Sequence, residues 1–89
     1  MRLKQSFQNK TDRPQFINLE LSTARFRLNP HDELVLFYDA DKVQDELGAT
    51  LRVEFIASDD GIELCVWTNE VEMFFPDGRR APQDFGRRL

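Results

Sequence analysis

The side chains that could form a catalytic pair in this chain are its single cysteine, Cys65, and its single histidine, His31. A cysteine nucleophile needs a base within hydrogen-bonding distance, and histidine usually supplies it. Cys65 lies in "GIELCVW", which alternates like a strand, whereas His31 follows Asn29-Pro30 in a β-turn pattern. A neutral, structural cysteine is therefore the simpler interpretation of Cys65.

The other candidate sites have weak patterns. Ser6, Ser22 and Ser58 have no Gly-x-Ser-x-Gly context. Residues 31–33 offer three consecutive metal-binding side chains, but neighbours in a strand point to opposite faces. The carboxylates of residues 39–46 lack the glycine and spacing of a calcium loop, and the glycines form no phosphate loop. The sequence thus predicts no catalytic residue, metal site or cofactor, and we expect a protein that is not an enzyme.

Length and composition indicate one folded domain covering residues 1–89. Hydrophobic residues make up 40% of the chain and charged residues 31%, as in ordinary globular domains. The basic start "MRLKQSFQNK" is followed by no apolar stretch typical of a signal peptide, and no window resembles a membrane span. We expect a cytoplasmic protein, with Cys65 reduced and no contact with a membrane.

The charge is unevenly distributed along the chain. The net charge is −4, yet residues 1–31 and 73–89 are basic while residues 32–72 are acidic. Nucleic-acid binding usually needs a concentrated positive surface, so the negative total disfavours it. A nucleic-acid-associated accessory factor remains the alternative function, and its candidate contacts are the arginines near the two ends: Arg25, Arg27, Arg79, Arg80, Arg87 and Arg88.

Apolar residues mostly recur with a period of two, and turn residues interrupt them at short intervals. The pattern predicts strands at residues 2–8, 15–22, 24–28 and 33–39. The last of these is almost entirely apolar, which suits a strand buried on both faces. Residues 39–48 could form one helical turn. We therefore predict an all-β fold, a small antiparallel β-sandwich of six or seven strands with at most one short helical turn.

Residues 50–79 are expected to form a three-stranded meander. Turns at Asp60-Gly61 and Thr68-Asn69 would give one consistent apolar face, and a slip of one residue would bury glutamates. The expected neighbours on that face are Phe55–Val66, Ala57–Leu64, Val66–Val71, Leu64–Met73 and Ile62–Phe75.

The opposite face of this meander is the candidate site. Its apolar members are Ile56, Cys65, Trp67 and Phe74, and they are rimmed by Glu54, Glu63, Glu70 and Glu72. Aromatic residues rimmed by charge are typical of an interface, either in a homodimer or with another protein. Alternatively, residues 79–89 fold back, place Phe85 and Leu89 on this face and set their arginines against its glutamates, or the first strand covers the face as a second core layer.

Several motifs along the chain resemble those of a family of short, uncharacterised bacterial proteins. The shared elements are an N-x-T-D-x-P turn, a Leu-Glu pair, an F-x-L-x-P segment, a tryptophan-bearing strand and a D-G-R triplet. They correspond here to Asn9, Thr11, Asp12 and Pro14, to Leu19 and Glu20, to Phe26, Leu28 and Pro30, to Trp67, and to Asp77, Gly78 and Arg79. The resemblance implies a small β-sandwich and brings no activity with it. The leading expectation is a noncatalytic binding or protein–protein interaction module.

Overall fold

The structure is a computed structural model that describes residues 1–43, 46–59 and 61–84. In these ranges the chain forms strands and no helix, which confirms the all-β prediction. The strands are β1 (Arg2–Gln8), β2 (Gln15–Leu19), β3 (Ala24–Leu28), β4 (Glu33–Asp39), β5 (Arg52–Ser58), β6 (Gly61–Trp67) and β7 (Asn69–Phe74). No helix in the described part of the chain is long and apolar enough to cross a membrane.

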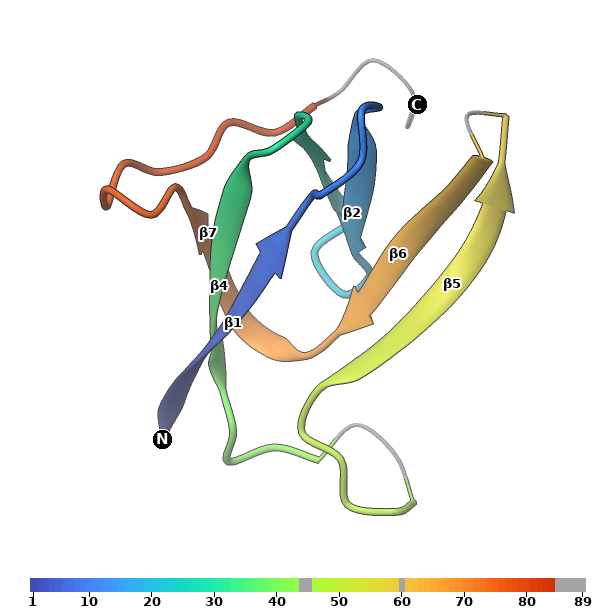
Figure 1. The fold of residues 1–89 in the computed structure, drawn as a ribbon. Coiled ribbons are helices and arrows are strands. Elements are labelled where there is room, and N and C mark those ends of the chain that lie inside the picture. Colours follow the sequence, from blue (N-terminus) through green and yellow to red (C-terminus); the bar gives the residue numbers. More distant parts are fainter. Residues whose placement is uncertain (44–45, 60, 85–89) are drawn as a thin grey trace.

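The strands form two layers, as Figure 1 shows. Sheet A has the order β1-β4-β7, and sheet B has the order β3-β2-β6-β5. All pairings are antiparallel except β2 with β6, where Ile17 lies opposite Leu64 and Leu19 opposite Val66 in parallel. The predicted small antiparallel sandwich is thus confirmed, with β2–β6 as the parallel pair among the described strands. This pair is parallel because the chain leaves sheet B after β3, contributes β4 to sheet A, and re-enters sheet B as β5 at its edge, so that β6 lies beside β2.

The predicted meander is wrong at its second turn. Thr68 is not part of a hairpin: β7 pairs with β4, so the chain passes from sheet B to sheet A at this residue. Thr68 is buried, and its Oγ1 donates a hydrogen bond to the carbonyl of Thr50 at 2.8 Å. The switch places the apolar rows of β6 and β7 in opposite layers, where Val66 and Met73 both enter the core from facing sheets.

The β5–β6 hairpin is formed, in a different register from the predicted one. Phe55 lies opposite Leu64 instead of Val66, and Ala57 opposite Ile62 instead of Leu64. The reason is that Gly61, with φ of 115°, begins β6 and pairs with Ser58 instead of completing the turn. Asp60, the other residue of the expected turn, lies outside the described residues. The two faces of the hairpin keep the predicted odd–even composition.

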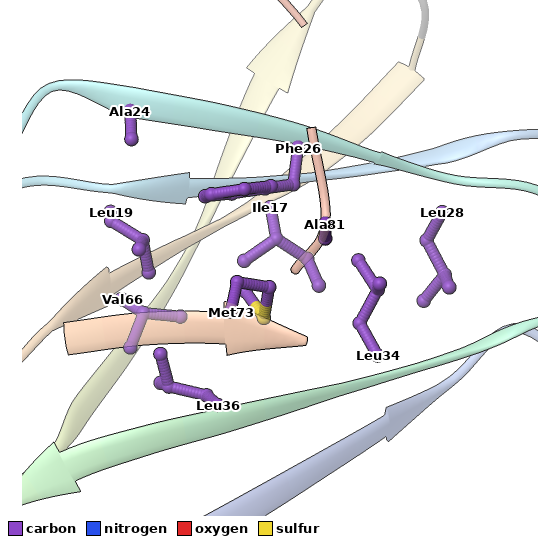
Figure 2. Close-up of a cluster of buried hydrophobic side chains, with 10 residues drawn as sticks. All are labelled: Ile17, Leu19, Ala24, Phe26, Leu28, Leu34, Leu36, Val66, Met73 and Ala81. Carbon is purple, nitrogen blue, oxygen red and sulfur yellow. The ribbon is translucent and has the colours of Figure 1, made fainter. Parts of the chain in front are cut away.

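The core lies between the two sheets, as Figure 2 shows. Its buried members are Ile17, Leu19, Ala24, Phe26, Leu28, Leu34, Leu36, Val66, Met73 and Ala81. On β4 only the even-numbered residues are buried, while Val35 and Phe37 are half-buried. The expectation that residues 33–39 are buried on both faces is therefore wrong, because no layer covers the second face of sheet A in the described part of the chain.

The segment expected to form a helical turn, residues 39–48, adopts turns where it is described. Gln44 and Asp45 lie outside the described residues, so the middle of that prediction does too.

The Asn9 turn explains the first motif as a structural device. Asn9 is buried, and its Nδ2 donates to the carbonyls of Arg13 and Leu28 at 2.7 and 3.0 Å. Its Oδ1 accepts from the backbone N–H and the hydroxyl of Thr11. Buried polar groups are stable when they are hydrogen-bonded in this way. The motif therefore joins the β1–β2 turn to the end of β3.

The two sides of the sandwich differ in how they are closed. Beyond β7, the chain crosses from sheet A to sheet B: the Ala81 N–H donates to the Met73 carbonyl, and the Asp84 N–H to the Arg25 carbonyl. Ala81 is buried there. On the other side, a hollow of about 410 Å³ remains between the layers, and its lining includes Phe7, Phe55 and Ile62. The sandwich is thus closed beside β3 and β7 and open towards β5.

Candidate functional site

The predicted contact patch is divided between the two sheets. Ile56, Cys65 and Trp67 lie on the outer face of sheet B, opposite the residues of the same strands that line the core. Phe74 belongs to β7, where it pairs with Val35 on the outer face of sheet A. The predicted contiguity of the four residues is wrong because the chain changes sheets at Thr68, between β6 and β7.

Within the patch, Ile56 is the exposed member. Cys65 is only 4% exposed, and it lies between Asn18 of β2 and Glu54 of β5. Trp67 is half-buried, and its Nε1–H donates to the Glu54 Oε1 at 2.6 Å. His31, the candidate base for Cys65, lies in the β3–β4 turn, where its backbone N–H donates to the Asn9 carbonyl. The two residues opposite Cys65 on the neighbouring strands are Asn18 and Glu54, and neither is a histidine.

A buried ion pair lies on the same outer face of sheet B. Arg25 is 3% exposed and contacts Glu63 twice, through Nη2 to Oε2 at 3.2 Å and Nε to Oε1 at 3.4 Å. Asn18 Nδ2 donates to Glu63 Oε1 at 3.0 Å, and the Phe16 ring lies 3.7 Å from the Arg25 guanidinium carbon. Asp84 approaches the same arginine at 3.5 Å. The charges of the arginine and the two acids pair with one another, which favours a structural role.

Sequence reasoning missed this ion pair. Arg25 was grouped with candidate nucleic-acid contacts and Glu63 with the rim of the patch. The two residues are 38 positions apart, and only the β3-β2-β6 order of sheet B brings them together. The sequence did place an arginine and a glutamate on the polar faces of two predicted strands. It did not show which strands are neighbours, so the two residues could not be paired from it.

Residues 81–84 of the C-terminal segment fold back as far as Arg25 of β3, and the backbone hydrogen bonds described above join them to Met73 and Arg25, which are not residues of the predicted patch. The contact is made by an acidic residue on a buried arginine, the reverse of the expected arrangement of arginines on glutamates. Phe85 and Leu89 lie outside the described residues. The first strand does not cover this face, because β1 pairs with β4 in sheet A.

Acidification is expected to destabilise the domain through Glu63. Burial by itself opposes ionisation of this carboxyl, but hydrogen bonds from Arg25, Asn18 and Ser58 outweigh burial and hold the pKa of Glu63 below its ordinary value of 4.5. A carboxyl with a lowered folded-state pKa contributes stability above its unfolded-state pKa, and loses that contribution as the pH falls through the folded-state pKa. We therefore expect the free energy of unfolding to decrease from about pH 5 downward.

Urea unfolding of the wild type and of Glu63→Gln at pH 7 and at pH 4 checks this expectation. The variant should be less stable at pH 7 and should lose less stability on acidification than the wild type. Other carboxyls with a lowered pKa, such as Glu33 and Asp77, contribute equally to both proteins. An unchanged pH dependence in the variant would contradict the role given to Glu63.

The first candidate interaction surface is the inner face of the β5–β6 hairpin. Phe55 is 74% exposed and Ile62 58% exposed, although the sequence pattern placed both in the core. Val53 and Ala57 are exposed on the same face. The expectation is wrong here because sheet A does not pack onto this part of the hairpin: the hollow lined by Phe7, Phe55 and Ile62 lies there instead. We name Val53, Phe55, Ala57 and Ile62 the β5 face.

The second candidate surface is a groove of about 410 Å³ on the outer face of sheet A. Its floor contains Val35, Phe37 and Phe74, and the two rings pack edge-to-face with centroids 5.4 Å apart. Phe75 lies at one end, and Arg2 and Lys4 of β1 line one side. We name this hollow the aromatic groove.

Four of the six arginines proposed as nucleic-acid contacts lie in the described part of the chain, and of these four Arg79 and Arg80 flank the aromatic groove. Their guanidinium groups lie over the rings of Phe75 and Phe74, at 4.9 and 5.3 Å. Arg25 is buried in sheet B, and Arg27 is exposed on the outer face of the same sheet. The last two, Arg87 and Arg88, lie outside the described residues.

The described residues contain no group of three or more histidine, cysteine, aspartate or glutamate side chains that could hold a metal ion. No family model, curated protein or solved structure matches the chain. The class that the fold itself defines is a small all-β sandwich of two sheets with one open side.

Proposed function

We propose that this protein is a noncatalytic protein-interaction module that associates with a second copy of itself along the edge of β5. The observation that supports the proposal is the β5 face, a contiguous apolar surface on β5, the edge strand of sheet B, and on Ile62 of its neighbour β6. An apolar edge strand is a template for pairing with another strand, and monomeric proteins usually protect such an edge with inward-pointing charges. The inner row of β5 has none.

The sequence of β5 favours its own copy as the partner. In an antiparallel pair centred on Phe55, the two Phe55 rings are neighbours and each Val53 lies opposite an Ala57. On the other face, Glu54 lies opposite Ile56 and Arg52 opposite Ser58. No two like charges face each other in this register, and every inner position is apolar, as stable cross-strand pairs require. A two-fold pair of this kind is closed and self-complementary.

Sedimentation analysis over a range of protein concentrations tests the proposal. We expect the wild type to form a dimer and Phe55→Glu to sediment as a monomer. The variant should keep the thermal stability of a folded protomer, because a side chain that is 74% exposed contributes little to the isolated sandwich. The matched control is Leu47→Glu, because Leu47 is 95% exposed but lies in the loop before β5.

The control variant should dimerise like the wild type. A wild type that remains monomeric at every concentration would refute the proposal, as would a Phe55→Glu variant that dimerises normally. A cytoplasmic location belongs to the same proposal, supported by the single cysteine of the sequence, which is buried.

A further inference from the structure

We infer that the aromatic groove of sheet A binds single-stranded nucleic acid, independently of association through β5. Proteins that bind single strands without sequence preference combine aromatic rings, on which bases stack, with cations that follow the phosphate backbone. The outer face of sheet A has both, on its central strand and on the strands that flank it.

The aromatic part consists of Phe37, Phe74 and Phe75. All three are half-buried and line the groove. Phe37 is on the central strand β4, and Phe74 is its edge-to-face neighbour on β7. Half-buried phenylalanines on an uncovered sheet face offer stacking surface at little conformational cost, because the sheet already holds them in place.

Cations surround these rings on both sides. From β1, Arg2 and Lys4 lie over the Phe37 ring at 5.9 and 5.6 Å. From beyond β7, Arg80 lies over Phe74 and Arg79 over Phe75. Arg2 and Lys4 thus bring two like charges to one ring, an arrangement that an anion placed between them would stabilise.

The carboxylates at the groove do not cancel this charge. Glu72 is held by Arg2 at 2.6 Å and by Arg80 at 2.7 Å, so that one acid serves two arginines. Asp77 is paired with Arg79 at 2.7 Å. Lys4 has no carboxylate within ion-pair distance among the described residues. Glu33 lies beyond Val35 and limits the site at that end. The groove is therefore locally positive in a chain whose net charge is −4.

The combination favours a single strand over other anions. An acidic peptide would use the cations and leave the rings without a stacking partner. Double-stranded nucleic acid keeps its bases stacked inside the helix and presents only phosphates and groove edges. A single strand presents unstacked bases beside phosphates. The groove presents aromatic rings for the bases and, 5–6 Å from the ring centroids, cations for the phosphates.

Fluorescence anisotropy with a labelled thymidine oligonucleotide of about ten residues tests the inference. Binding is expected at low salt, with a slope of log K against log salt of about −2 to −3, because three or four phosphates would be neutralised. Phe37→Ala should weaken binding roughly tenfold or more, since stacking on an aromatic ring would be lost. Lys4→Glu should weaken it by a similar factor, and Lys4 is exposed, so the fold of that variant is not at risk.

Two further variants make the test specific. Glu72→Gln should tighten binding a few-fold, because it removes a negative charge that lines the groove and releases Arg2 and Arg80 for phosphates. Arg27→Ala is the matched control: it removes an exposed arginine from sheet B and should leave binding unchanged. Phe55→Glu should also bind normally, because β5 lies in the other sheet.

Either of two results would overturn the inference. The first is an absence of binding at low salt. The second is binding that polyglutamate displaces as readily as unlabelled oligonucleotide and that a folded Phe37→Ala variant retains in full, because the groove would then be an attractor for any polyanion.

Discussion

Arg25→Ala is expected to lose about 3–5 kcal/mol of unfolding free energy, because it leaves the buried carboxylate of Glu63 without its cationic partner. The total stability of a domain of this size is about 5–10 kcal/mol, so the loss would be a large part of it. Asn18 would still donate to Glu63, but the amide carries no charge to offset burial. Phe16 would also lose the guanidinium group that packs against its ring.

Urea unfolding at pH 7 measures this loss, and three comparisons make it interpretable. Arg27→Ala, an exposed arginine of the same strand and face, should cost less than about 0.5 kcal/mol. The double variant Arg25→Met, Glu63→Leu should recover most of the stability, since an apolar pair avoids the desolvation of both charges. In Arg25→Ala itself, the pKa of Glu63 should rise, so that acidification should reduce the difference from the wild type. A loss below about 1 kcal/mol would mean that the pair is effectively solvated.

Leu36→Ala is expected to cost about 3–4 kcal/mol. Leu36 is completely buried on β4, the central strand of sheet A, and belongs to the core cluster that includes Met73 of the neighbouring strand β7 and Val66 of sheet B. Truncating the side chain removes buried apolar surface and leaves a cavity. The surrounding strands cannot move in to fill this cavity without breaking hydrogen bonds to their neighbours in the sheet.

The control for this prediction is Val35→Ala, one residue earlier on the same strand. Val35 faces the aromatic groove and is half-buried, so its truncation should cost about 1 kcal/mol or less. Thermal and urea unfolding of both variants check the pair of expectations. Similar losses at the two positions would contradict the assignment of one face of β4 to the core and the other to the groove.

The sequence by itself was sufficient for the local elements of the fold. Residues 2–8, 24–28 and 33–39 were predicted as strands and form β1, β3 and β4 with the same bounds. Alternation of apolar residues also separated the faces correctly on β6, where Val66 enters the core and Trp67 does not. Both results depend on interactions within a few residues: side chains alternate across a strand, and turn residues interrupt it.

The pairing of strands was decided by the tertiary structure. A meander of β5, β6 and β7 satisfied every local rule, yet the chain leaves sheet B at Thr68. The same apolar rows can pack side by side in one sheet or face to face across two, and only the second arrangement gives Val66 and Met73 a common core. That choice depends on all seven strands together, so no window of sequence contains it.

The candidate sites follow from the same choice. Cys65, Trp67 and Phe74 looked contiguous along the chain, but the switch at Thr68 sends Phe74 to the outer face of sheet A, beside Phe37 and the cations of β1. It also leaves Phe55 and Ile62 without a covering layer. Residue types and strand faces were readable from the sequence because they are local properties. Which faces are covered, and which distant charges meet, depends on the packing of the two sheets around one small core. That core leaves the side of the sandwich towards β5 open.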